Sequence, residues 1–155
     1  MSQFDYRSIK TLEDACKKLG INVEAFLAKY SAMPDHITAL ASLELITKAV
    51  NDGWEHPLEP GYTVYYPWYW LHDRDHDGQS PDADEVTYIR PDGSCGLVFA
   101  SSFCAWSHSY ASLGSRLACK SREIAKYVAI QFKDLYASWL FPQAWHNKGK
   151  EDFNL

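Results

Sequence analysis

Residues 34–53 read "PDHITALASLELITKAVNDG", and no other part of the chain shows its local structure as clearly. Apolar residues recur there every three or four positions, which is the period of one face of an α-helix. The stripe consists of Ile37, Leu40, Leu43, Ile46 and Val50, widened by Leu45 and Ala49. We predict that Asp35 caps this helix, that Gly53 ends it and that the stripe belongs to the core.

Two shorter helices are predicted before this stretch. Thr11, with Asp14 three residues later, forms a variant of the capping box, and Gly20 suits a C-terminal stop. Asn22 suits the cap of the next helix, in "INVEAFLAKY". No basic recognition helix follows this pair, so we do not expect a DNA-reading helix-turn-helix.

Beyond residue 60 the apolar period changes from that of a helix to that of a strand. In "YTVYYPWYWLH", residues 62–72, alternate side chains share a face, and Pro67 predicts an edge, a bulge or a break. Residues 85–102, "EVTYIRPDGSCGLVFASS", predict a hairpin about a Pro-Asp-Gly turn. Further strands are predicted in "FCAWSHSY" (103–110) and "SRLACK" (115–120).

A last helix is predicted over residues 121–141, capped by Ser121 and stopped by Pro142. Helices, then strands, then a helix predict an α+β fold, with the N-terminal helices and a C-terminal helix packed on an antiparallel sheet. We expect one domain over residues 1–155, in which about 143–155 form a flexible tail.

Charge and composition exclude several classes of protein. The net charge is -5, and residues 72–85, "HDRDHDGQSPDADE", carry six acidic residues and one arginine, so the remainder is nearly neutral and offers no broad footprint for duplex DNA. "MSQFDYRSIK" has no apolar region typical of a secretion signal, and no stretch is long enough to span a membrane. We therefore expect the cytoplasm of a bacterial host or a virion, and four reduced cysteines.

The acidic loop resembles the start of a calcium-binding loop. Asp73, Asp75 and Asp77 alternate ahead of Gly78, Gln79 can offer its carbonyl, and Asp84 takes the twelfth position, where glutamate is usual. The flanks are strand-like, which does not fit an ordinary EF-hand. Calcium is the one cofactor that the sequence suggests, and the alternative is a solvated acidic loop.

Aromatic and basic residues form a second candidate surface, because aromatic residues make up 15% of the chain. Exposed rings on residues 62–71 can anchor a protein interface or stack on single-stranded bases. The candidates are Tyr66, Trp68 and Trp70 with the basic Arg116, Lys120, Arg122 and Lys126. The alternative is a ring-rich core beside a solvated helix face.

No pattern typical of catalysis is present in the sequence. It lacks the Gly-x-Ser-x-Gly elbow of serine hydrolases and a glycine-rich phosphate loop, and its cysteine and histidine spacings fit no compact zinc motif. We therefore expect no catalytic residues.

Residues 113–136, "LGSRLACKSREIAKYVAIQFKDLY", resemble a motif of small hypothetical proteins of phages and mobile elements of gut Bacteroidetes. That motif has a Gly-Ser-Arg-Leu strand and a Lys-Ser helix start, and "TLEDACKKLGI" and "YYPWYWL" are similar to other parts of the family. The lysine that the family has before Gln131 is Ile130 here. The resemblance implies a genetic setting and no activity.

These observations lead to a functional hypothesis. We expect a non-enzymatic accessory protein of a phage or mobile element, acting by protein–protein contact in the virion or the host cell. The first alternative is a single-stranded nucleic-acid-binding protein that uses residues 62–71, and the second is an enzyme of unrecognised type. A protein partner is expected ahead of nucleic acid, and no membrane association is expected.

Overall fold

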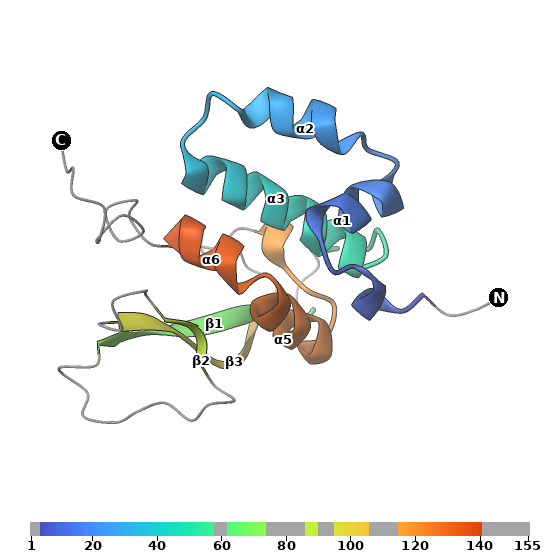
Figure 1. Ribbon diagram of the computed structural model, residues 1–155. Coiled ribbons are helices and arrows are strands. Elements are labelled where there is room, and N and C mark those ends of the chain that lie inside the picture. Colours follow the sequence, from blue (N-terminus) through green and yellow to red (C-terminus); the bar gives the residue numbers. More distant parts are fainter. Residues whose placement is uncertain (1–3, 58–61, 74–85, 90–94, 106–114, 141–155) are drawn as a thin grey trace, which may run out of the picture.

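The computed structural model of the chain describes residues 4–57, 62–73, 86–89, 95–105 and 115–140 (Figure 1). Five α-helices lie in these ranges: α1 (Leu12–Leu19), α2 (Val23–Tyr30), α3 (Asp35–Val50), α5 (Arg122–Gln131) and α6 (Lys133–Leu140). Two 3-10 turns, η1 (Tyr6–Ser8) and η2 (Ser115–Leu117), accompany them. The described strands are β1 (Val64–Asp73), β2 (Val86–Ile89) and β3 (Cys95–Ala105).

The short helices α1, α2 and α5 begin where the sequence predicts, and α1 also ends where it predicts. Thr11 and Asp14 form a reciprocal capping box, each side-chain oxygen accepting the other residue's N–H at 3.1 Å. Gly20 ends α1 in the left-handed conformation, with φ of 69°. Asn22 and Ser121 cap α2 and α5, accepting the N–H three residues later at 2.8 and 3.3 Å. These caps are confirmed.

The predicted boundaries of α3 need correction. Pro34 takes the cap position, and Asp35 is the first residue of the helix, where its carboxylate faces the positive end of the helix dipole. The helix ends at Val50, ahead of Gly53. Ile37 is exposed, because burial along α3 begins only at Ala39. From there, the buried side chains are Ala39, Ser42, Leu43, Ile46, Thr47, Ala49 and Val50.

The helices pack mainly on one another, which corrects the predicted fold class. The main packing partners of α3 are α6 and α1, whereas α5 contacts β1 and β3, and α6 also contacts β2. Figure 1 shows α5 and α6 between α3 and the strands. An α+β fold with the N-terminal helices packed on an antiparallel sheet is therefore wrong. The described residues are mostly helical, and α3 buries too wide a face for a single partner surface.

The helix predicted over residues 121–141 is divided in two. Phe132 leaves the helical conformation, with φ of -113° and ψ of 29°, and separates α5 from α6. Its side chain is buried, together with Ile124 and Val128. After the break, Tyr136 and Ala137 are the buried side chains of α6. The break thus lets two short helices bury different faces.

The strands pair in the order β1-β3-β2, antiparallel throughout (Figure 1). The predicted strand over residues 115–120 is wrong: η2 occupies its start, and a single bridge joins Cys119 to Tyr65, with N to O distances of 2.8 and 3.0 Å. The N–H and C=O of Tyr65 bond to Cys119 and therefore point away from β3. Two residues later along the strand, the backbone groups of Pro67 point to the same side. Proline has no N–H, but β1 thus loses no hydrogen bond to β3 at this position.

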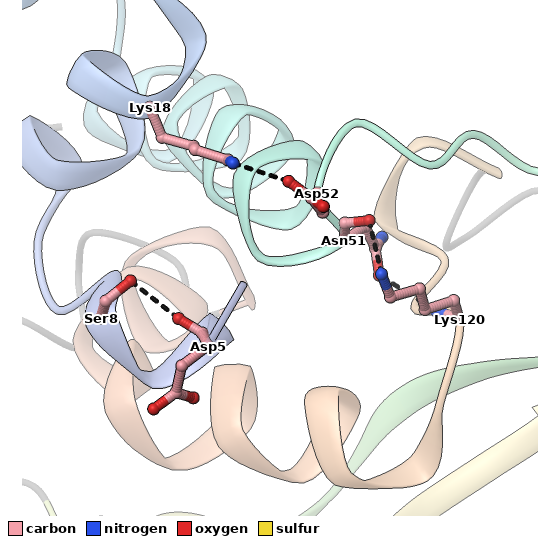
Figure 2. A network of polar contacts seen from close by, with 6 residues as sticks. All are labelled: Asp5, Ser8, Lys18, Asn51, Asp52 and Lys120. Carbon is pink, nitrogen blue, oxygen red and sulfur yellow. Dashed lines mark hydrogen bonds and ion pairs between the residues drawn. The ribbon is translucent and has the colours of Figure 1, made fainter. Parts of the chain in front are cut away.

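Asn51, directly after α3, holds the residues that lead into α5 (Figure 2). Its Nδ2 donates to the carbonyl oxygen of Ala118 at 2.8 Å, and its Oδ1 accepts the N–H of Lys120 at 3.0 Å. The Lys120 ammonium donates to the Asn51 carbonyl oxygen at 2.9 Å. Residues 118–120 thus lie between the Asn51 amide and the backbone of Tyr65, and both edges of this segment are hydrogen-bonded.

We predict that Asn51→Ala destabilises the protein more than the matched change Asn22→Ala. Loss of the buried amide leaves a carbonyl and an N–H without partners, at about 1–3 kcal/mol each, whereas loss of an exposed helix cap costs about 1 kcal/mol. Urea unfolding followed by circular dichroism gives both free energies. Equal losses would show that Asn51 contributes no more than a surface cap.

We also predict a pH dependence from the ion pair of Asp52 with Lys18, whose Nζ lies 2.6 Å from Oδ1. The hydrogen bond from Lys18 lowers the pKa of Asp52 below its ordinary value. The folded pKa lies below the unfolded one, so this stabilisation is present above about pH 4 and is lost as the pH falls further.

The variant Asp52→Asn should therefore lose less thermal stability than the parent between about pH 5 and pH 3. Asparagine also tolerates the left-handed φ of 57° at this position. Adding Lys18→Gln to that variant should change the pH profile no further. If the Tm of the parent and that of Asp52→Asn depend on pH in the same way, the ion pair of Lys18 with Asp52 contributes nothing to the stability.

Candidate functional site

The helix α2 is apolar, yet none of its side chains is buried. Six of the eight residues in "VEAFLAKY" are apolar. Val23, Phe26 and Tyr30 are half-buried, and the rings of Phe26 and Tyr30 lie 4.9 Å apart. The other residues of α2 are exposed. A helix with this composition ordinarily covers its apolar side chains, so this one presents an unusual surface.

Large apolar side chains are exposed on α2, in the turns on either side of it and at the start of α3. The exposed fraction is 42% for Leu27 and 51% for Met33. It is 36% for Ile21 and 37% for Ile37. We call these four residues the α2 surface. Figure 1 shows α2 on the outside of the helical layer, on the far side of α3 from the strands. Large exposed apolar side chains, where they gather, mark interaction sites.

The charges on α2 itself are balanced. Glu24 and Lys29 are both exposed, and neither forms an ion pair with a residue that the structure describes. The Lys29 ammonium lies 5.5 Å from the centre of the Tyr30 ring. One acidic and one basic residue give this helix no net charge, so it does not attract phosphate.

The sequence contained a signal for this surface. In a helix of only two turns, Ala25 and Ala28 lie on a different side from Val23 and Phe26, so one packing partner cannot cover all of them. An apolar composition without a single stripe predicts exposure when the helix lies at the surface.

The aromatic residues of β1 do not form one displayed face. Tyr66 is completely buried, whereas Trp68 is 43% exposed. Tyr69 is half-buried, and its hydroxyl donates to the carbonyl oxygen of Ala129 at 2.8 Å. The register with β3 shifts between Trp68 and Tyr69, which interrupts the alternation that the sequence implies. Trp70 lies in β1, opposite Val98.

The four basic candidates are separated. Arg116 is exposed, and its Nη1 lies 3.6 Å from Oε2 of Glu44. Lys120 is held by Asn51 and borders a cavity of about 410 Å³ together with Phe4, Asp5, Tyr6, Val50 and Ile124. Arg122 and Lys126 are exposed on α5. Two of the four cations therefore already have partners within the protein.

Most of the predicted calcium loop lies outside the described residues. Asp73 is the last residue of β1 and pairs with Cys95 of β3. Asp75, Asp77, Gln79 and Asp84 fall in the range that the structure does not describe. Among the described residues, no group of three His, Cys, Asp or Glu side chains is arranged to hold a metal ion.

A cleft that the sequence does not predict lies beside the second half of α3. Its volume is about 390 Å³, and it is lined by Glu44, Leu45, Lys48, Asn51, Trp54, Glu55, His56, Arg116 and Ala118. Lys48 Nζ lies 2.8 Å from Glu55 Oε1, and Arg116 faces Glu44. The Trp54 ring stacks on Tyr62, with centres 5.9 Å apart. Its charges are paired, so the cleft has no net attraction for an ion.

The buried thiols and phenols are poor reactive groups. Burial raises the pKa of Cys119 to about 12, and burial also raises the pKa of Cys16. The pKa values of Tyr69 and Tyr136 are raised by burial as well. These groups therefore stay protonated at neutral pH, whereas a nucleophilic cysteine has a lowered pKa and access to solvent.

Comparison with protein-family models, with curated proteins and with solved structures gave no match. The helices in the described part of the chain are all too short or too polar to cross a membrane.

We predict that Cys16 and Cys119 resist alkylation in the native protein. Both are free and buried, and their raised pKa values leave almost no thiolate. N-ethylmaleimide at neutral pH should modify them only after denaturation, as measured by peptide mass mapping. Labelling of either one in the native protein, at the rate of free cysteine, would contradict the burial described here.

Proposed function

We propose that this chain is a non-enzymatic accessory protein that acts by protein–protein contact through the α2 surface. The observation that carries the proposal is the exposure of Ile21, Leu27, Met33 and Ile37 around a helix that buries none of its own side chains. Fully covering a single leucine contributes about 1.5–3 kcal/mol, so a partner on this surface gains stability from burial alone.

Two features support a protein partner ahead of nucleic acid. The α2 surface carries no excess of positive charge, whereas nucleic-acid affinity depends largely on lysine and arginine. In β1, the structure exposes Trp68 but buries Tyr66, which removes one of the rings proposed to stack on bases. The single-stranded nucleic-acid alternative therefore rests on Trp68 and on Trp70.

The genetic setting is part of the same proposal. The resemblance of residues 113–136 to small phage and mobile-element proteins supports a role in a virion or in the host cell. Mass spectrometry of purified virions distinguishes these two places.

A photo-crosslinking amino acid at Leu27 tests the contact in cells. We expect light to give a discrete covalent adduct at this position, because a partner that covers α2 lies within reach of the side chain. The adduct is measured by gel shift and identified by mass spectrometry.

The matched control carries the same photo-crosslinking amino acid at Lys126, which is exposed on α5 and lies outside the α2 surface. It should give no discrete adduct. The absence of an adduct at Leu27, or the same adducts at both positions, would overturn the proposed function.

A further inference from the structure

We propose that the cleft beside the second half of α3 binds a free α-amino acid with an aromatic side chain. The carboxylate of the amino acid faces Arg116, its ammonium group faces Glu44, and its ring lies on Trp54. This inference goes beyond the proposed function, because the cleft and the α2 surface share no residue. The cleft volume of about 390 Å³ is typical of a site that holds one small molecule.

The base of the cleft is fixed by hydrogen bonds within the protein. Asn51 and Ala118 are both buried, and the Asn51 Nδ2 donates to the Ala118 carbonyl oxygen at 2.8 Å. The backbone N–H of Trp54 donates to the carbonyl oxygen of Asn51 at 3.1 Å. These bonds join the segments that line the cleft on α3, directly after α3 and ahead of α5. A ligand therefore meets a preformed site, which reduces the entropy cost of binding.

Trp54 supplies a flat apolar surface to the cleft. Tyr62 stacks on its ring, with centres 5.9 Å apart and an interplanar angle of 27°, and Tyr62 is not among the residues that line the cleft. The indole is therefore supported by Tyr62 on one face, and it borders the cleft with the surface that remains. Leu45 adds apolar area to the lining. An aromatic ring on such a surface gains stacking energy in addition to burial, so the expected ligand carries a ring.

Arg116 and Glu44 retain hydrogen-bonding capacity for a ligand. Arg116 Nη1 lies 3.6 Å from Glu44 Oε2, which is longer than an ordinary hydrogen bond. Neither side chain makes another polar contact with a residue in the described part of the chain. A guanidinium group has five N–H donors and a carboxylate has two acceptor oxygens. Both groups can therefore bind a ligand while they stay beside each other.

The closeness of these two charges favours a ligand that carries both signs. An anion that approaches Arg116 also meets the negative charge of Glu44, and a cation that approaches Glu44 meets Arg116. An α-amino acid has its carboxylate and its ammonium group on one carbon atom, so each group meets its opposite charge at the same time. Lys48 and Glu55, paired at 2.8 Å, add no net charge. The cleft thus suits a ligand without net charge.

An NMR titration of the full chain with free phenylalanine tests the proposal. The size of this ligand gives an expected Kd of about 1 mM. Three analogues each lack one feature: phenethylamine has no carboxylate, phenylpropionate has no ammonium group, and alanine has no ring. Each analogue should bind about 10-fold more weakly than phenylalanine, because it leaves one group of the cleft without a partner.

Variants of the cleft locate the binding. Arg116→Ala and Glu44→Gln should each weaken the binding of phenylalanine by about 10-fold, whereas the matched control Arg122→Ala, an exposed site on α5, should leave the Kd unchanged. Circular dichroism shows that each variant retains its helices. The spectrum of Trp54→Phe identifies the indole N–H signal of Trp54, which should shift in the parent as phenylalanine is added.

Four outcomes overturn the proposal. The first is a parent spectrum that does not change up to about 10 mM phenylalanine, ten times the expected Kd. The second is an analogue with a single charge, or without a ring, that binds as tightly as phenylalanine. The third is binding by Arg116→Ala and Glu44→Gln that equals the binding by the parent. The fourth is a shift of other indole signals while that of Trp54 stays in place.

Discussion

The arrangement of this protein depends on one buried amide. Asn51 hydrogen-bonds the backbone on both sides of Cys119, while Cys119 itself bonds to β1. The N–H and C=O groups of a buried backbone segment need hydrogen-bond partners. In a sheet a neighbouring strand supplies these partners, and here the side chain of Asn51 supplies them. The end of α3, the first part of β1 and the start of α5 are therefore fixed relative to one another at this point.

Local signals in the sequence predict local structure well. Thr11, Asn22 and Ser121 cap helices because a side-chain oxygen near a free N–H needs no information from elsewhere in the chain. The pattern of α3 likewise predicts a buried helix. The prediction is wrong for the first turn of the helix. Ile37 matches the apolar period, but its side chain is exposed because the first turn of α3 extends beyond the core.

The errors concern contacts between distant residues. "SRLACK" alternates as a strand does, yet the partner of the residues on both sides of Cys119 is the amide of Asn51, 67 positions before Ala118 and 69 before Lys120, and no local pattern encodes it. The break at Phe132 contains no proline or glycine from which it could be predicted.

Of the candidate sites, the exposed apolar helix α2 could be predicted from its composition. The cleft beside α3 could not, because Glu44, Trp54 and Arg116 meet only after folding.

The same amide has a consequence for how the chain tolerates change in its length. Between Trp54 and Leu117 the chain leaves the helices, forms the strands and returns to within hydrogen-bonding distance of its point of departure. Closing such an excursion costs entropy that rises only with the logarithm of its length, about 0.6 kcal/mol for each doubling. Insertions or deletions in this excursion therefore change the closure entropy only slightly, and their cost is set instead by the contacts of the strands with α5 and α6, such as the hydrogen bond from Tyr69 to Ala129.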